Sequence, residues 1–210
     1  MKTKFTRRQL IKYLGLGTAG LVVGQTPFAC SEKKHIITLS FDDGFEKSRG
    51  HEIMPHSYDH QNLTEMPLEE AKESILRCLD VFNNELNDFD AKESVYNFAY
   101  NASSPKIEEW LGTQVRAFRT GGPALNPPPY PGQKRLTCIS HGPENIDQHL
   151  GETIDQFLEG PDGWFIYNTH GLDDEGWGPV SSAFLDELLD RLSKIKTLEI
   201  LPAGKVLSRI

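Results

Sequence analysis

Short β-rich runs alternate with longer amphipathic segments along this chain, and this alternation constrains the fold more than any other feature. Strands are expected at 35–41, 94–100, 115–119, 136–140, 164–169 and 198–201. Helices are expected at 68–86, 106–111, 147–158 and 182–195. Because strands that alternate with helices favour parallel βα units, the pattern predicts an α/β fold with a parallel sheet.

Polar and glycine-containing motifs directly follow three of the predicted strands. They are Asp42-Asp43-Gly44, Thr120-Gly121-Gly122 and His170-Gly171. In parallel α/β folds the carboxyl ends of the strands meet at one edge, where side chains are held firmly and the loops vary. We therefore expect a functional site at that edge.

The charge of the chain excludes one class of partner. A formal net charge of -8 is the opposite of the basic surface that nucleic-acid binding requires. The apolar fraction of 38% and the charged fraction of 25% are those of an ordinary globular protein. After an N-terminal segment is removed, the 210-residue chain is long enough for one domain with a core of its own, over 31–210.

The first 30 residues have the pattern of an export signal. Arg7 and Arg8 precede an apolar, glycine-rich run at 13–23, which is too short for a permanent membrane anchor. The pattern resembles a twin-arginine signal, and a general secretory signal is the alternative. Cys30 is a candidate for lipid attachment at the end of this segment. We therefore expect a protein exported to the periplasm or cell envelope, with contact to the membrane only through the signal or a lipid on Cys30.

Carboxylates and histidines occur together in a pattern that favours metal-assisted hydrolysis. A catalytic zinc usually has three protein ligands and one open position. His56 and His60 are four residues apart and can reach one ion from one side of a helical turn, with a carboxylate as third ligand. Of the adjacent Asp42 and Asp43, one can bind metal while the other accepts a proton from water. His170, at the end of a distant strand, can then protonate the leaving group.

Three segments resemble motifs of the polysaccharide deacetylases, the NodB-homology enzymes of carbohydrate esterase family 4. The segment 40–44 (SFDDG) resembles their first motif, 56–60 (HSYDH) the second and 167–170 (YNTH) the fifth. The resemblance covers nearly all of the chain from His35 onward. It implies a (β/α) barrel, one divalent metal ion with zinc favoured, and removal of acetyl groups from a carbohydrate.

The resemblance also assigns a role to each residue of the pattern. It implies that Asp42 is the catalytic base and His170 the catalytic acid. Asp43, His56 and His60 would bind the metal ion.

Two motifs of the family are altered or missing. The family's third motif has an arginine that steadies the base, whereas this chain has Ala99 at that place. Arg119, after the next strand, is the candidate to replace it. We predict Arg119, Tyr100 and Trp177 as the substrate-binding residues, with Trp177 placed to stack on a sugar. The fourth motif, an Asp-Trp pair, has no evident match.

The connection between Asp43 and His56 is much shorter than in the family, which has a helix, a strand and a second helix there. The junction near 48–50 looks like a missing block. Loss of an interior strand leaves exposed strand edges and an underfilled core. The predicted fold is therefore an incomplete or distorted (β/α) barrel of the NodB-homology type, less stable and less active than a full-length relative.

Three functions are compatible with these observations. The first is a metal-dependent hydrolase that removes acetyl groups, N-acetyl favoured, from an acetylated oligo- or polysaccharide. The second is an impaired or inactive shortened homologue that still binds glycan. The third is another metal-dependent hydrolase, such as a phosphoesterase, for which the residues at 173–175 are a spare acidic cluster.

Overall fold

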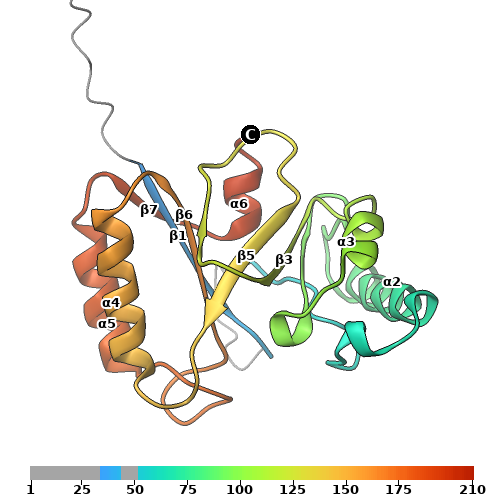
Figure 1. Ribbon diagram of the computed structural model, residues 1–210, viewed down its shortest axis with the longest axis horizontal. Coiled ribbons are helices and arrows are strands. Elements are labelled where there is room, and N and C mark those ends of the chain that lie inside the picture. Colours follow the sequence, from blue (N-terminus) through green and yellow to red (C-terminus); the bar gives the residue numbers. More distant parts are fainter. Residues whose placement is uncertain (1–33, 44–51) are drawn as a thin grey trace, which may run out of the picture. The chain divides into compact units, whose positions relative to one another are not determined.

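A seven-stranded, mostly parallel sheet with helices on both faces forms the part of the chain that the structure describes (Figure 1). This computed structural model describes residues 34–43 and 52–210. The predicted α/β class is thereby confirmed. The predicted signal segment, with Arg7, Arg8 and Cys30, lies outside the described residues, as does Gly44. Among the described residues, no helix is long and apolar enough to cross a lipid bilayer.

The strands follow the order β2-β3-β5-β6-β1-β7, and β4 pairs with β6 as the antiparallel member. The strands are β1 (His35–Phe41), β2 (Val95–Asn97), β3 (Ala117–Gly121), β4 (Leu125–Asn126), β5 (Arg135–Ser140), β6 (Gly163–Thr169) and β7 (Leu198–Ile200). The helices are α2 (Leu68–Glu85), α3 (Pro105–Leu111), α4 (Ile146–Glu159), α5 (Ser182–Ser193) and α6 (Ala203–Leu207), with short 3-10 turns η1 (Leu63–Glu65) and η2 (Ala99–Asn101). The strands and helices that the alternating pattern predicts are present, whereas β4 and α6 were not predicted.

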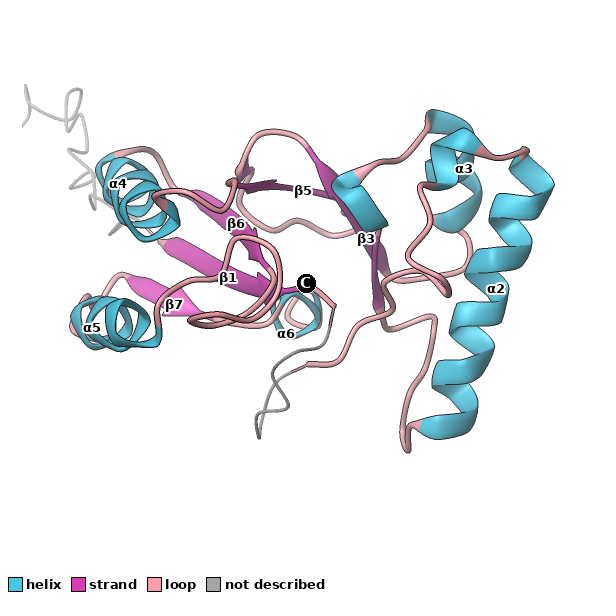
Figure 2. Cartoon of the chain, turned by 90° about the horizontal axis from the view of Figure 1, so that it is seen from below, coloured by secondary structure: helices cyan, strands magenta, loops and turns pink. Residues whose placement is uncertain are grey.

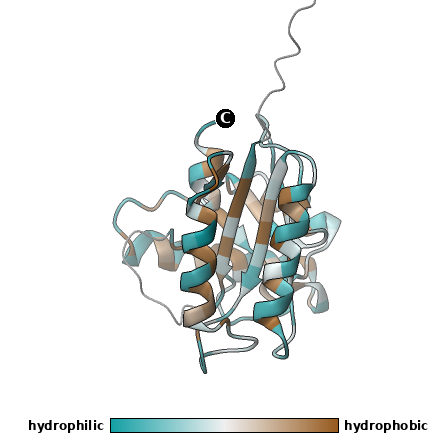
Figure 3. Ribbon diagram, turned by 90° about the vertical axis from the view of Figure 1, so that its left-hand side faces the viewer, coloured by the Kyte–Doolittle hydropathy of each residue, from teal (hydrophilic) through white to brown (hydrophobic). Residues whose placement is uncertain are grey.

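Side chains alternate between the two faces of the sheet, and each face has its own apolar core. On one face, Ile37 of β1 and Phe165 of β6 pack against α4 and α5. At the other end of this face, Tyr96 and Phe118 pack against α2 and α3. Figure 2 shows these two helix pairs at opposite ends of the sheet. In Figure 3, α4 and α5 present hydrophilic residues outward and apolar residues toward the strands.

The opposite face of the sheet, which we call the inner face, packs against α6. Its core contains Trp164 and Ile166 of β6, Val95 of β2, Ala117 of β3 and Val206 of α6. Trp164 is fully buried, and its indole N–H donates to Thr38 Oγ1 at 2.9 Å. The inner face thus holds side chains of strands from both ends of the sheet in one cluster.

The segment that follows the short connection is not a strand over the described residues 52–55, although residues 50–53 resemble the strand that leads into the second motif of the family. The amide N–H of Asn97 donates to the Pro55 carbonyl at 2.8 Å, so this segment lies beside β2. Met54 packs against the inner-face core. In the described part of the chain, β1 pairs with β6 and β7 but not with β2. The sheet therefore ends at β2 and β7.

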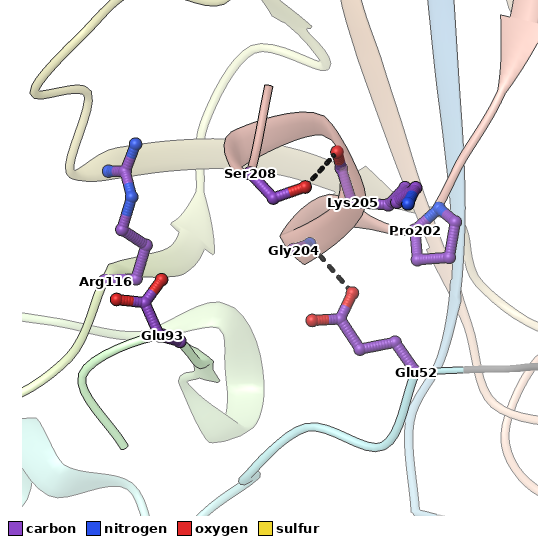
Figure 4. A pocket seen from close by; sticks show the side chains of 7 residues that line it. All are labelled: Glu52, Glu93, Arg116, Pro202, Gly204, Lys205 and Ser208. Atoms are coloured by element: carbon purple, nitrogen blue, oxygen red, sulfur yellow. Dashed lines mark hydrogen bonds between the residues drawn. The ribbon is translucent and has the colours of Figure 1, made fainter. Parts of the chain in front are cut away.

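A polar hollow of about 420 Å³ lies at the amino end of the strands, beside α6 (Figure 4). It is lined by Glu52, Glu93, Arg116, Pro202, Gly204, Lys205 and Ser208. The carboxylate of Glu52 accepts the N–H of Gly204 at 2.8 Å. A Cβ at position 204 would lie 1.9 Å from a Glu52 carboxylate oxygen, so a side chain there would displace the Glu52 carboxylate. Burial raises the pKa of Glu52, although the Gly204 hydrogen bond partly offsets it.

The raised pKa of Glu52 predicts how stability changes with pH when the charge is removed. The pKa of the Glu52 carboxyl is higher in the folded chain than in the unfolded chain. Its contribution to the free energy of unfolding is therefore full at pH values below its ordinary pKa, and it is lost as the pH rises through the folded-state pKa. Glu52→Gln keeps an oxygen that accepts the Gly204 N–H and cannot ionise. We expect its free energy of unfolding at neutral pH to match or exceed that of the wild type, with the gain vanishing in acid.

Urea denaturation across this pH range measures the effect. Glu69→Gln, which removes one exposed charge from α2, is the control for the change in net charge. A Glu52→Gln variant whose stability relative to wild type is lower at neutral pH than in acid would contradict the assignment.

Candidate metal centre

The parallel pairing of β1 with β6 brings the two aspartates and His170 to the same edge of the sheet. Phe41 is in register with Thr169, and the N–H of Asp42 donates to the Thr169 carbonyl at 2.9 Å. The next residue after Thr169 is His170. Asp43 adopts a left-handed conformation (φ 65°), and its carboxylate lies 3.7 Å from His56 Nε2, close to that of Asp42 at 3.5 Å from the same atom. Asp42 is buried, whereas the side chain of Asp43 is 31% exposed.

The segment 56–60 is an irregular loop, so the predicted helical turn is wrong. Ser57 and His60 have positive φ values of 73° and 50°, which a right-handed helix does not allow. The loop is held instead by His56, whose Nδ1 lies 3.2 Å from the carbonyl oxygen of Asn97 at the end of β2. The two imidazole rings still face the same region, with centroids 5.2 Å apart.

The contact with Asn97 selects the form of His56 that can bind metal. Because a carbonyl oxygen only accepts, Nδ1 carries the proton and Nε2 keeps its lone pair. Burial also lowers the pKa of His56, which favours the neutral ring. Nε2 is buried and makes no hydrogen bond in the described part of the chain. It lies 3.7 Å from Asp43 Oδ1.

Asp43, His56 and His60 converge on one point. Asp43 Oδ1 lies 3.3 Å from His60 Nε2, and one ligand atom from each of the three residues lies within 4.8 Å of the others. Two tetrahedral ligands that are each about 2.1 Å from a zinc ion are roughly 3.4 Å apart. The donor set fits a zinc ion, and the two distances from Asp43 Oδ1, 3.3 Å and 3.7 Å, are close to the spacing that such an ion needs.

This is the one cluster of three or more such ligands within residues 34–43 and 52–210. The acidic residues at 173–175 do not form a second cluster of this kind among the described residues. The described side chains thus offer one metal site, not two.

Asp42 stands beside this cluster and is held by a buried ion pair. Arg119 Nη2 donates to Asp42 Oδ2 at 2.6 Å, and the two side chains are 2% and 5% exposed. Arg119 Nη1 donates to Ser40 Oγ at 3.1 Å, and Ser40 Oγ donates to Asp42 Oδ1 at 3.3 Å. The structure thus brings Arg119 to the residue that it was predicted to steady.

The ion pair keeps Asp42 ionised. Burial by itself raises the pKa of this carboxyl, but the charge of Arg119 and its hydrogen bond to Asp42 outweigh burial and leave the pKa lowered. Burial likewise acts to lower the pKa of Arg119, and its pairing with Asp42 leaves that pKa raised. An ionised carboxylate, which can accept a proton, therefore lies 3.5 Å from His56 Nε2, beside the cluster of Asp43, His56 and His60.

Two exposed aromatic side chains border this group of residues. Tyr100 is 63% exposed, and its ring lies 4.7 Å from the His60 ring. Trp177 is 52% exposed and meets the His170 ring edge to face at 5.4 Å.

His170 lies close enough to Asp42 to lower the pKa of that carboxyl. Its Nδ1 is buried without a hydrogen-bond partner among the described residues.

Tyr100 sits in a strained turn that β3 and β5 support. Tyr100 and Asn101 both have positive φ values, 57° and 50°, and such conformations cost free energy and concentrate at functional sites. Thr120 Oγ1 donates to the Asn101 carbonyl at 3.0 Å, and Cys138 Sγ donates to Asn101 Oδ1 at 3.2 Å. A Cβ on Gly121 would lie 2.8 Å from the Asn101 carbonyl oxygen. The Thr120-Gly121 motif thus supports this turn.

Ser40 and Asn97 were not predicted as site residues. Ser40 precedes Asp42 by two positions in a strand, so alternation places both on the same face, but nothing in the sequence pairs Ser40 with Arg119. Asn97 acts through its carbonyl, which any residue would supply.

Comparisons of this chain with protein-family models, with curated proteins and with solved structures found no match. Its function is therefore inferred from the geometry and chemistry of the site.

The buried ion pair gives a prediction about stability. Arg119→Met leaves the Asp42 carboxylate buried without its partner, and breaking a buried pair costs about 3–5 kcal/mol. We expect a loss of this size in the free energy of unfolding, measured by urea denaturation with a chelator present. Arg191→Met breaks the exposed pair with Asp155 and should cost less than about 1 kcal/mol. Equal effects of the two substitutions would show that the Asp42 pair is not a buried ion pair in solution.

Proposed function

We propose that this chain is an exported, metal-dependent hydrolase that removes acetyl groups, N-acetyl favoured, from an acetylated oligo- or polysaccharide. One observation carries the proposal. Three converging ligands from Asp43, His56 and His60 lie next to a separate carboxylate, Asp42, which is buried and held ionised. A hydrolase of this kind needs both a ligand set with an open position and a base that does not itself bind the metal.

The donor set favours zinc over harder ions. Two imidazole nitrogens and one carboxylate oxygen are a typical catalytic zinc set, whereas magnesium and calcium prefer oxygen ligands. When bound, a zinc ion polarises a carbonyl oxygen and makes water more acidic.

The remaining steps belong to the protein's own side chains. Asp42 accepts a proton from the attacking water, whose oxygen forms a bond to the acetyl carbon. Arg119 keeps Asp42 ionised and oriented for this transfer. As the carbon–nitrogen bond breaks, His170 gives a proton to the nitrogen, and acetate and an amine leave. For an ester-linked acetyl group, the same proton would go to the alcohol oxygen.

The substrate class is supported by the aromatic side chains beside the site. Tyr100 next to His60 and Trp177 next to His170 both present exposed rings, which can stack on the apolar faces of sugars. The three motifs that resemble polysaccharide deacetylases point in the same direction. A two-metal phosphoesterase is less well supported, because the described residues offer one ligand cluster.

We interpret the sheet as an incomplete (β/α) barrel of the NodB-homology type. Three features support this interpretation. The strands other than β4 run parallel, helix pairs cover one face, and inner-face side chains from β1, β2, β3, β5 and β6 share one core. The sheet is open between β2 and β7, next to the place where the connection after β1 is short. A twin-arginine route would let this domain fold and take up its metal before export.

Two substitutions separate metal binding from turnover. His60→Ala removes one of three ligands, so we expect the purified chain to lose most of its zinc and nearly all acetate release from acetylated chitooligosaccharide. Asp42→Asn removes the proton acceptor and the negative charge of the buried pair but keeps an oxygen that Arg119 can donate to, so the zinc content of the folded fraction should stay near that of the wild type while acetate release falls by at least about a hundredfold. His149→Ala, outside the ligand cluster, is the control and should change neither.

Zinc content and acetate are measured on samples shown to be folded by circular dichroism. Undiminished zinc in His60→Ala would overturn the ligand assignment. Zinc binding without acetate release by the wild type would favour the inactive glycan-binding homologue, and phosphate release from phosphoesters would favour the phosphoesterase.

A further inference from the structure

We propose that Ser40 is a positioning residue whose hydroxyl fixes the orientation of both Asp42 and Arg119. The inference rests on the proposed function, because it concerns how the base is held. Ser40 Oγ accepts from Arg119 Nη1 at 3.1 Å and donates to Asp42 Oδ1 at 3.3 Å. Arg119 Nη2 donates to Asp42 Oδ2 at 2.6 Å, and so the three side chains form a closed ring of hydrogen bonds.

Each hydrogen bond in this ring restrains a rotation that is otherwise soft. The terminal torsion of an aspartate has a broad, roughly two-fold profile, so one donor alone leaves the carboxylate free to turn. Ser40 and Arg119 donate to different oxygens of Asp42, and two donors from two directions fix that torsion. The base then presents its oxygens in one orientation, as proton transfer requires.

The guanidinium of Arg119 depends on Ser40 in the same way. In the described part of the chain its hydrogen bonds go to Asp42 and Ser40, and its buried Nε–H has no partner. With Ser40 removed, one hydrogen bond to Asp42 would remain, about which the guanidinium plane can rotate. Ser40 therefore determines the geometry of the ion pair, while Arg119 supplies its charge.

The position of Ser40 follows from strand geometry. Thr38, Ser40 and Asp42 are every second residue along β1 and just beyond its end, so they lie on the same face of the sheet. Thr38 and Ser40 both line a small inner-face cavity of about 10 Å³. Ser40 is in register with Asn168 of β6, so the central strand pair sets its height along the sheet. Arg119 lines the same cavity from β3. This volume is close to the lower limit for one water molecule, and a methyl group added at Ser40 would have to fit there.

Three variants test the proposal through kinetics. Ser40→Ala should lower kcat for acetate release by about tenfold or more, as expected for loss of hydrogen bonds to charged groups, with KM and zinc content little changed. Ser40→Thr keeps the hydroxyl and places its methyl in the cavity, so it should restore kcat to within about threefold of wild type. Thr38→Ala is the matched control on the same face of β1, since its hydroxyl bonds to the Leu201 carbonyl and the Trp164 indole.

Thr38→Ala should lower stability but leave kcat of the folded protein unchanged. If Ser40→Ala lowers kcat no more than Thr38→Ala does, or if Ser40→Thr fails to restore it, Ser40 is a structural residue only.

A second measurement does not depend on activity. In ¹⁵N NMR spectra, a guanidinium held by two hydrogen bonds should give separate Nη1 and Nη2 signals for Arg119. We expect separate signals in the wild type, Ser40→Thr and Thr38→Ala, and merged signals in Ser40→Ala. Merged signals in the wild type, or separate ones in Ser40→Ala, would overturn the proposal. Separate signals in a wild type that releases no acetate would instead overturn the proposed function and leave the orientation of the pair intact.

Discussion

The buried ion pair between Asp42 and Arg119 is the interaction on which the rest of the site depends. Moving two charges out of water is costly, and the contact at 2.6 Å offsets that cost only while both partners stay in place. The pair joins the end of β1 to β3, which lies three places away in the strand order. It thereby sets the position of the β1 end, and with it Asp43, relative to the β2–β3 end of the sheet.

The proposed metal ligands come from the two regions that this pair connects. Asp43 follows β1, whereas the loop of His56 and His60 is fastened to β2 through the carbonyl of Asn97. β1 and β2 do not pair within the described residues, so hydrogen bonding between them cannot hold these ligands together. The intervening strands β6, β5 and β3, the ion pair, the Ser40 hydroxyl and the shared inner-face core make that connection instead.

Local patterns in the sequence predicted the elements well, and long-range contacts explain the exceptions. Hydrophobic periodicity located the long helices, and strand-end motifs located Asp42, Asp43 and His170 at one edge. The spacing of His56 and His60 indicated proximity but not conformation, because Asn97 and two left-handed residues set the loop. The strand expected to reach Tyr100 ends at Asn97, where β3 and β5 support a strained turn. Ser40 was missed because its partner Arg119 lies 79 positions away.

The most direct test of this account is the zinc K-edge X-ray absorption spectrum of the purified chain after it has been loaded with one equivalent of zinc. The account predicts nitrogen and oxygen neighbours at about 2.0–2.1 Å, with the multiple-scattering pattern of two imidazole rings. Sulfur neighbours at about 2.3 Å, or a spectrum with one imidazole or none, would contradict a centre built from Asp43, His56 and His60.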